Sequence, residues 1–343
     1  MRGFFRYFLQ PLDRFILLIT NFFIFLTITL SPKCQDVQLS LYSLHPLFVN
    51  PAYTGNFTGD WRFSAGYRNQ QVVTAQPFQT AIASFDGHFY LLNQKLGAGL
   101  YLLNDKSGIG GLTFNKIYGS LAYETDIHNN IICIGIQGGF VSGNVNNWGN
   151  WDNTSGTFTA PNGEEYFGEK TSYADVNFGI SWKRKMNKLL PQVGFSLLHL
   201  NNPNISFFEG NEKQSIQFLL DTRINIEVSD ELLITPLVLF KTQSGISKSI
   251  LGTDIRYTFQ GKRNPVKAVF GGFHLQNGVV ENASSVLVQL GTRVKRIDLA
   301  FGYEHNLGVF GESAGKIGAF EIAIVYESIS TVLNSYSIPC ERF

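Results

Sequence analysis

One stretch decides the fold: residues 214–228 read QSIQFLLDTRINIEV. Its even positions, from Ile216 to Val228, are almost all apolar, whereas its odd positions, from Gln217 to Glu227, are mostly polar or charged. Successive side chains of a β-strand point to opposite faces, so this alternation predicts a strand with one apolar and one polar face. A helix would mix the two sets.

The length of the alternation favours a membrane barrel over a soluble sandwich. Strands of globular proteins usually have about five or six residues. About thirteen residues that rise about 3.3 Å each and tilt by about 45° span about 30 Å, which is the thickness of the hydrocarbon core of a bilayer. We therefore predict that 214–228 is one strand of a transmembrane β-barrel, with its apolar face toward lipid.

The same period recurs along the chain and predicts an all-β protein, an antiparallel barrel of about fourteen strands. The number is even, as in single-chain bacterial outer-membrane barrels. The strands are expected near 61–68, 78–90, 96–103, 114–125, 131–142, 173–184, 191–200, 214–228, 231–242, 247–260, 265–276, 283–293, 296–306 and 317–327. The barrel as a whole is expected over residues 61–327.

Polar and charged residues inside these strands fall mostly on one parity, which we assign to the lumen. Lysine or arginine facing lipid costs about 2–4 kcal/mol at the bilayer midplane, so sequences avoid it. The expected lumenal set is Asp175, Asn177, Asp221, Arg223, Glu227, Asp254, Arg256, Asp298, Glu304 and Glu321. Pairs such as Asp221 with Arg223, or Asp254 with Arg256, are interpreted as a salt network that fills the lumen rather than as a catalytic constellation.

The connections between the strands give an independent check. From a periplasmic N-terminus, links at the outer end are mostly long and links at the periplasmic end are all short, as in outer-membrane barrels. The longest link, 143–172, contains Trp148 and Trp151 and is the predicted extracellular lid, plug or partner-contact loop.

The chain ends carry separate signals. Arg2, Arg6 and Arg14 precede an apolar run from Phe15 to Leu30, so residues 1–34 are expected to be a secretory signal peptide. Residues 35–60 and 328–343 are expected to be periplasmic segments that either plug the barrel or contact periplasmic components. A disulfide between Cys34 and Cys340 is left open, because barrel closure would bring both ends together.

Composition limits the function classes. Only 15% of the residues are charged, and the chain has 30 Phe and 34 Gly among 343 residues, whereas about a quarter of the residues of globular proteins are charged. The net charge of +1 gives no reason to expect nucleic acid as a partner.

Motifs for catalysis and metal binding are missing from the sequence. Its six histidines show no metal-ligand spacing, and no nucleophile or phosphate-binding motif is present. We expect no cofactor and no metal. A surface hydrolase remains an alternative, because His199, His274 and His305 fall at the outer ends of predicted strands.

Several short motifs follow one another along the chain, beginning with Asn50-Pro51-Ala52-Tyr53-Thr54-Gly55. The others are Arg68-Asn69-Gln70, Pro77-Phe78-Gln79-Thr80, Ala83-Ser84-Phe85-Asp86, Gly97-Ala98-Gly99, Asp175-Val176-Asn177-Phe178-Gly179, Gly194-Phe195-Ser196 and Gly318-Ala319-Phe320-Glu321-Ile322. Taken in order, they resemble the PorP/SprF family of the type IX secretion and gliding-motility machinery of Bacteroidetes. The resemblance covers essentially the whole chain after the predicted signal.

The resemblance implies an outer-membrane protein that is not an enzyme. Family members bind a large secreted adhesin through its C-terminal sorting domain and assist its export or its anchoring at the surface. The implied partners are this cargo, type IX secretion components and the lipid bilayer. Asn50, Pro51, Tyr53 and Gly55 are either a structural turn or a partner-recognition site, and a general porin or small-solute channel is the alternative function.

Overall fold

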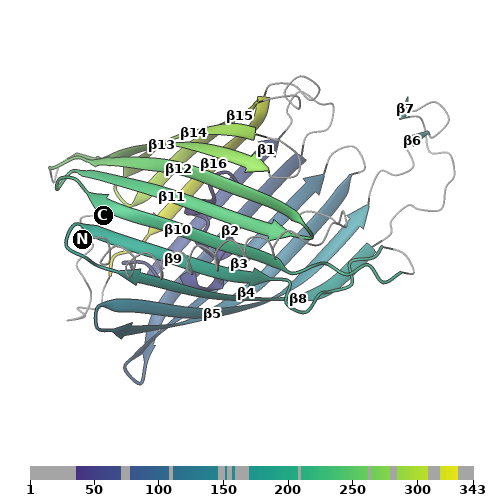
Figure 1. Ribbon diagram of the computed structural model, residues 1–343, viewed down its shortest axis with the longest axis horizontal. Helices are drawn as coiled ribbons and strands as arrows, with labels where there is room; N and C mark the ends of the chain where they lie inside the picture. Colours follow the sequence, from purple (N-terminus) through teal and green to yellow (C-terminus); the bar gives the residue numbers. More distant parts are fainter. Residues whose placement is uncertain are drawn as a thin grey trace, which may run out of the picture.

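A closed antiparallel β-barrel of fourteen strands makes up most of the chain (Figure 1). The computed structural model describes residues 36–70, 78–107, 111–145, 151–152, 157–158, 170–207, 210–261, 264–278, 284–307 and 317–330. The strands are β1 (Trp61–Gln70), β2 (Phe78–Leu91), β3 (Gln94–Ser107), β4 (Leu112–Ile127), β5 (Asn130–Val145), β8 (Lys170–Arg184), β9 (Leu189–Leu198), β10 (Gln217–Glu227), β11 (Leu232–Gln243), β12 (Ile246–Thr258), β13 (Val266–Gly278), β14 (Ser284–Val294), β15 (Ile297–Leu307) and β16 (Ile317–Glu327).

Each barrel strand pairs with the next one along the chain, and the first pairs with the last. The seam between β1 and β16 runs from Arg62 opposite Glu327 to Gln70 opposite Ala319. Two further short strands, β6 (Trp151–Asp152) and β7 (Thr157–Phe158), form a separate two-stranded sheet. Within the described residues, no helix is long and apolar enough to cross a membrane.

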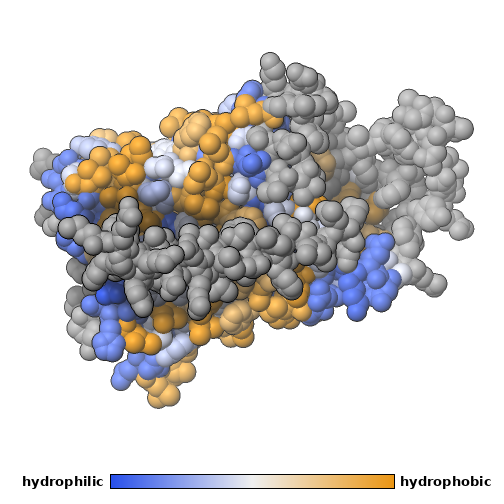
Figure 2. All heavy atoms as spheres, viewed as in Figure 1, coloured by the Kyte–Doolittle hydropathy of each residue, from blue (hydrophilic) through white to orange (hydrophobic). Residues whose placement is uncertain are grey.

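The alternation that predicted the strands decides which face each side chain occupies. In β4, Ile117 and Leu121 are exposed on the outside, whereas Tyr118 and Ser120 between them are buried inside. Figure 2 shows the resulting apolar outer surface. At the end where β1 begins, Trp61 packs 4.9 Å from Tyr326 between ring centroids, as part of an interfacial aromatic girdle.

The fourteen predicted strands are confirmed, and their ends differ in places for local reasons. The strand predicted over 214–228 begins only at Gln217, because the Gln214 amide donates to the Pro203 carbonyl and belongs to the preceding loop. The strand predicted over 191–200 ends at Leu198, because His199 has a φ of 61° and turns inward. The predicted loop 143–172 is shorter than expected, since β5 continues to Val145 and β8 begins at Lys170.

Residues 36–56, here called the plug, lie inside the barrel. Sequence analysis expected residues 35–60 on the periplasmic side, either as a plug or as a contact segment. The plug contains the 3₁₀ helix η1 (Tyr42–Leu44), the short helix α2 (Pro46–Val49) and the 3₁₀ helix η2 (Pro51–Tyr53). Pro46 and Pro51 stand at first helical positions, which tolerate the missing N–H of proline.

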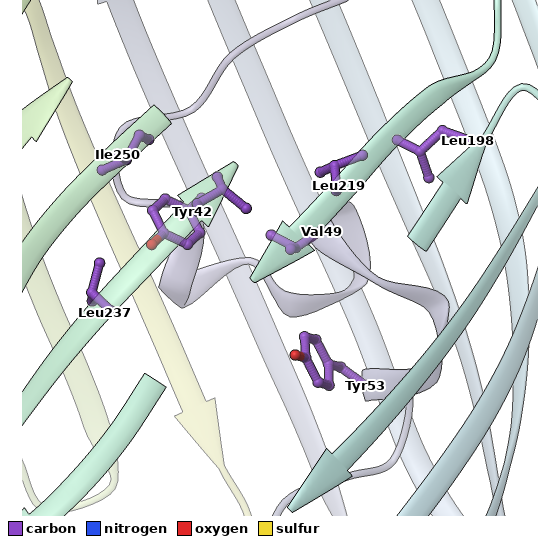
Figure 3. Close-up of a cluster of buried hydrophobic side chains, with 8 residues drawn as sticks. Tyr42, Val49, Tyr53, Leu198, Leu219, Leu237 and Ile250 are labelled. Atoms are coloured by element: carbon purple, nitrogen blue, oxygen red, sulfur yellow. The ribbon is translucent and has the colours of Figure 1, made fainter. Parts of the chain in front are cut away.

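Three apolar clusters form the core, and each joins the plug to the wall. Figure 3 shows one of them, in which three plug residues face strands β9 to β12. Its members are Tyr42, Val49 and Tyr53 of the plug and Leu198, Leu219, Leu237, Leu239 and Ile250 of the wall. The second places Leu39 and Leu47 against β2 to β5, and the third surrounds Leu41. The hydrophobic core is therefore built between the plug and the wall.

Candidate functional site: the plugged lumen

The beginning of the plug is held by a chain of charged and polar groups. Asp36 Oδ1 lies 2.5 Å from Lys116 Nζ, and Asp36 Oδ2 lies 3.2 Å from His199 Nε2. The other ring nitrogen of His199 is 2.8 Å from Asp175 Oδ2, which also accepts the Tyr118 hydroxyl at 2.5 Å. This chain links the plug to β4, to β8 and to the residue after β9.

The protonation states of His199 and Asp36, which lie outside the strands, follow from these contacts. Burial would lower the pKa of His199, but the carboxylates of Asp175 and Asp36 outweigh it and raise that pKa to about 9. Burial alone would raise the pKa of Asp36, but Lys116 and His199 hold it well below its usual value. His199 and Asp36 therefore carry opposite charges near neutral pH.

The middle of the plug is joined to the seam strands. The backbone amides of Ser40 and Leu41 donate to the two carboxylate oxygens of Glu321, at 2.7 and 3.1 Å. Arg68 lies between Glu304, at 2.9 Å, and Glu321, at 3.3 Å. Removing one member of a buried charged group costs about 3–5 kcal/mol, because an uncompensated charge is left behind.

Asn50 places the end of the plug against the opposite wall. Its side-chain amide donates to the carbonyls of Ile180 and Phe195, both at 3.2 Å, and its oxygen caps η2 by accepting from the Ala52 amide at 2.9 Å. Tyr53 then donates to Asp221 Oδ1 at 2.5 Å. The motif is thus a buried structural turn that is also bonded to β8, β9 and β10.

Wall glycines make room for this turn. A Cβ added at Gly135, Gly179 or Gly194 would overlap Pro51, Asn50 or Tyr53 respectively. Gly55 has a φ of 69°, a conformation that glycine adopts without strain, and its amide donates to Asp86 Oδ2 at 2.8 Å. The close approach explains why the strands carry glycine at these positions.

The residues proposed from sequence as partner contacts occupy different places. Asn50, Pro51, Tyr53 and Gly55 are buried against the protein's own wall, so no partner reaches them in this arrangement. Trp151 begins the two-residue strand β6. Trp148, the predicted signal peptide and both ends of the proposed Cys34–Cys340 bridge lie outside the described residues.

The ten residues proposed as lumenal all lie on the inward parity of their strands. Six are buried, and Arg223, Glu227, Asp254 and Arg256 are half-buried. The buried ones are Asp175, Asn177, Asp221, Asp298, Glu304 and Glu321.

The charge partners of this set differ in part from those expected. Asp221 and Arg223 approach to 3.9 Å, but Asp254 bonds His274 at 2.8 Å instead of Arg256. Arg256 lies 3.4 Å from Asp298, which also receives Arg293 at 2.6 Å. Asp254 of β12 thus pairs with a residue of the neighbouring strand β13, whereas Arg256 of β12 reaches Asp298 on β15, two strands further along the wall.

The lumenal set expected from sequence contains only polar residues, and the structure adds inward-facing apolar residues of the wall. Leu219, Leu237 and Ile250 occupy lumenal positions, where a water-filled barrel would carry polar residues, and all three pack against the plug. Leu219 was visible as an apolar exception on the polar face of 214–228. Such exceptions on several strands were the available signal that the lumen is filled.

The three histidines noted as hydrolase candidates lie beside carboxylates or an aromatic ring. His199 and His274 are buried beside carboxylates, and His305 lies on the outer face with its ring 6.4 Å from that of Tyr303. In the described part of the chain, no group of three or more His, Cys, Asp and Glu residues could hold a metal ion.

A comparison with known protein families shows to which family the chain belongs. Residues 31–326 match the family described as type IX secretion system membrane protein PorP/SprF. The chain belongs to the PorP/SprF family. No curated protein matches it. The family and the barrel fold identify this PorP/SprF member as an outer-membrane component of a secretion system.

Solved structures similar to this PorP/SprF barrel are distant. They include the toluene transporter TbuX of Ralstonia pickettii, at 11% identity over 84% of this chain and 94% of that chain with a TM-score of 0.45. The monoaromatic hydrocarbon channel CymD has 11% identity over 84% of this chain and 93% of that chain, with a TM-score of 0.48. A FadL homologue of Pseudomonas aeruginosa has 11% identity over 81% of this chain and 92% of that chain, with a TM-score of 0.45.

Proposed function

We propose that this barrel binds a secreted adhesin-type cargo through the C-terminal sorting domain of the cargo, and assists its export or its anchoring at the cell surface. The observation that carries the proposal is the plug. A barrel whose interior is packed with its own N-terminal segment is suited to binding at its surfaces, and gliding would depend on it through the adhesin it holds.

The packing of the plug argues against the alternative of a general porin. Plug residues such as Leu41, Asn50 and Ala52 have no exposed surface. A cavity between the plug and strands β9 to β12 measures about 20 Å³, which is room for about one water molecule. Passive diffusion of solutes through the described interior would require the plug to move.

The outer mouth is the face on which a cargo domain would dock. The loop after β9 folds over this mouth, where Asn204 pairs with Lys213 and the ring of Phe207 lies 6.1 Å from that of Phe114. We assign residues 1–34 to a cleaved signal peptide and 328–343 to a periplasmic tail, which would leave the outer loops free for cargo. Trp148 and Trp151 of the longest loop are the proposed contact residues.

An affinity purification tests the proposal. The tagged barrel is isolated from detergent-solubilised native membranes, and bound proteins are identified by mass spectrometry. We expect one large secreted protein, the cargo, to co-purify with the barrel. In cells that produce a cargo lacking its C-terminal domain, we expect this co-purification to be lost. A second tagged outer-membrane barrel from the same cells is the control. Recovery of the barrel alone, from cells that export such a cargo, would favour the channel.

A further inference from the structure

The outer half of β8 extends beyond the end of its neighbour β9. β8 runs from Lys170 to Arg184, but it pairs with β9 only from Phe178 to Lys183. On its other side, β8 pairs with β5 along its whole length. The outer end of β8 therefore has one side in the sheet and one side that no described strand covers.

Alternate residues of β8 present their backbone groups to the uncovered side. The Val176 carbonyl accepts from the Leu200 amide at 2.9 Å, and every second residue of a strand directs its N–H and C=O the same way. Lys170, Ser172 and Ala174 share this direction and are here called the β8 edge. Among the described residues, nothing forms a hydrogen bond with the amide or carbonyl of Ser172 or with the amide of Ala174.

A side-chain amide of the protein itself already bonds to the inner end of the β8 edge. Asn201 Nδ2 donates to the Ala174 carbonyl at 2.7 Å, and Asn201 Oδ1 accepts from the Val176 amide at 3.2 Å. This amide uses one C=O and one N–H of β8, as a peptide group of an added strand would. Ser172 offers the same pair of groups to a further amide.

The β8 edge lies on the aqueous side of the lipid-facing surface. Ser172 belongs to a row of outward-facing polar residues on four adjacent strands, the others being Ser142, Asn115 and Asn104. Within this row, the Asn104 side chain donates to Asn115 Oδ1 at 2.7 Å. The next row toward the bilayer is apolar, since Ile117 and Phe140 are exposed on the outside. A partner outside the cell therefore reaches Ser172 without entering lipid.

The chemistry of the β8 edge selects one kind of partner. An uncovered strand edge is a template for another strand, and main-chain hydrogen bonds supply the affinity when an extended peptide adds to it. Ser172 and Ala174 are exposed and small, so they leave room for the side chains of a strand beside them. The matching partner is an extended polypeptide rather than a helix or a small solute.

We infer that the β8 edge receives an extended segment of the secreted cargo, which joins the barrel sheet as an additional strand. The inference rests on the proposed function for the identity of the cargo, and the β8 edge supplies the mode of binding. β8 directly follows the longest loop in the chain, so strand addition and contacts from that loop act on the same side of the mouth.

A proline substitution tests the inference. Ser172→Pro removes the N–H that faces the added strand and places the proline ring in its path, whereas pairing with β5 does not use this N–H. Recovery of the cargo with the tagged barrel should fall about tenfold or more, because the donor is lost and the approach is blocked. Ser172→Ala keeps the N–H and is the matched control, with recovery equal to the wild type.

Only protein with the heat-dependent electrophoretic shift of a folded barrel is compared. Equal recovery of the cargo by the wild type and Ser172→Pro would overturn the inference and leave the proposed function standing. If the wild type itself recovers no cargo from cells that export one, both the inference and the proposed function fail.

Photo-crosslinking in living cells provides a second measurement that introduces no proline. A photoreactive amino acid replaces Ser172 in one strain and Asn115, in the same row but two strands away, in another. We expect an adduct of position 172 with the C-terminal domain of the cargo, and none from position 115. An adduct with a second copy of the barrel, the same adduct from both positions, or no protein adduct at all would overturn the inference.

Discussion

At the scale of single residues, glycines of the wall lie where the plug approaches it most closely. Gly135, Gly179 and Gly194 face inward on three neighbouring strands, and each lies where a Cβ would overlap the plug. Glycine weakens a strand interior by roughly 0.5–1 kcal/mol relative to alanine. The close fit of the Asn50 turn offsets that cost.

The first prediction compares two glycines of the same wall. Gly179→Ala should lower the free energy of unfolding by about 1–3 kcal/mol, because the added methyl group collides with the Asn50 side chain. Gly138→Ala is the control, since Gly138 faces outward and its added Cβ would meet nothing within 4 Å. Denaturant unfolding in lipid vesicles measures both. Equal stability of the two variants would show that the turn adjusts freely.

At the scale of elements, the plug is a segment of short helical turns fixed by charged contacts at its beginning. The pKa of His199 is raised from its usual 6.5 to about 9 by Asp175 and Asp36, so the stabilisation from these two contacts is fully present below pH 6.5 and is lost as pH rises through about 9. The pKa of Asp36 is lowered, so its contribution is present above its usual pKa and is lost as pH falls through the folded value.

The second prediction follows from the signs of these shifts. Raising the pH from 6.5 to 9.5 should increase hydrogen exchange in the first residues of the plug several-fold, after correction for intrinsic rates. His199→Gln keeps a hydrogen-bonding side chain but cannot titrate, so its exchange should not respond in this way. Mass spectrometry of peptides from residues 36–45 provides the measurement. An identical response of both proteins would mean that His199 does not control this anchor.

Elements with a repeating face could be predicted from the sequence, whereas a plug was only one of two alternatives for residues 35–60. Every strand alternates because one side meets lipid, as Ile117 and Leu121 of β4 illustrate. The plug meets protein on all sides, so its buried residues Leu41, Asn50 and Tyr53 follow no period. The partners of Asp254 and Arg256 depend on register between strands, which neither strand specifies alone.

At the scale of the whole molecule, the barrel is a wall around a resident segment rather than an open pore. In the described part of the chain all three apolar clusters include plug residues, so the plug and the wall share their hydrophobic core. Inward-facing Leu219, Leu237 and Ile250 would be exposed to water without the plug. The plug therefore contributes both to stability and to the permeability barrier.

The third prediction concerns conductance. In a planar bilayer the wild-type protein should be silent, and a variant without residues 36–56 should give discrete current steps, because the lumen is then open to ions. Only protein that shows the heat-dependent electrophoretic shift of a folded barrel is compared. Stable open conductance of the wild type would contradict the plugged arrangement and support the porin alternative.

The hydrogen bonds from Ser40 and Leu41 to Glu321, with the Arg68 cluster beside them, also bear on biogenesis. The segment that makes them is synthesised before any barrel strand, yet its partners include β16, which is synthesised last. Pairing of β1 with β16 is the step that closes the sheet. A plug already docked on β1 would offer β16 the amides of Ser40 and Leu41, next to Arg68 of β1 at the same seam. We therefore expect the plug to act as an internal template for the latest step of insertion.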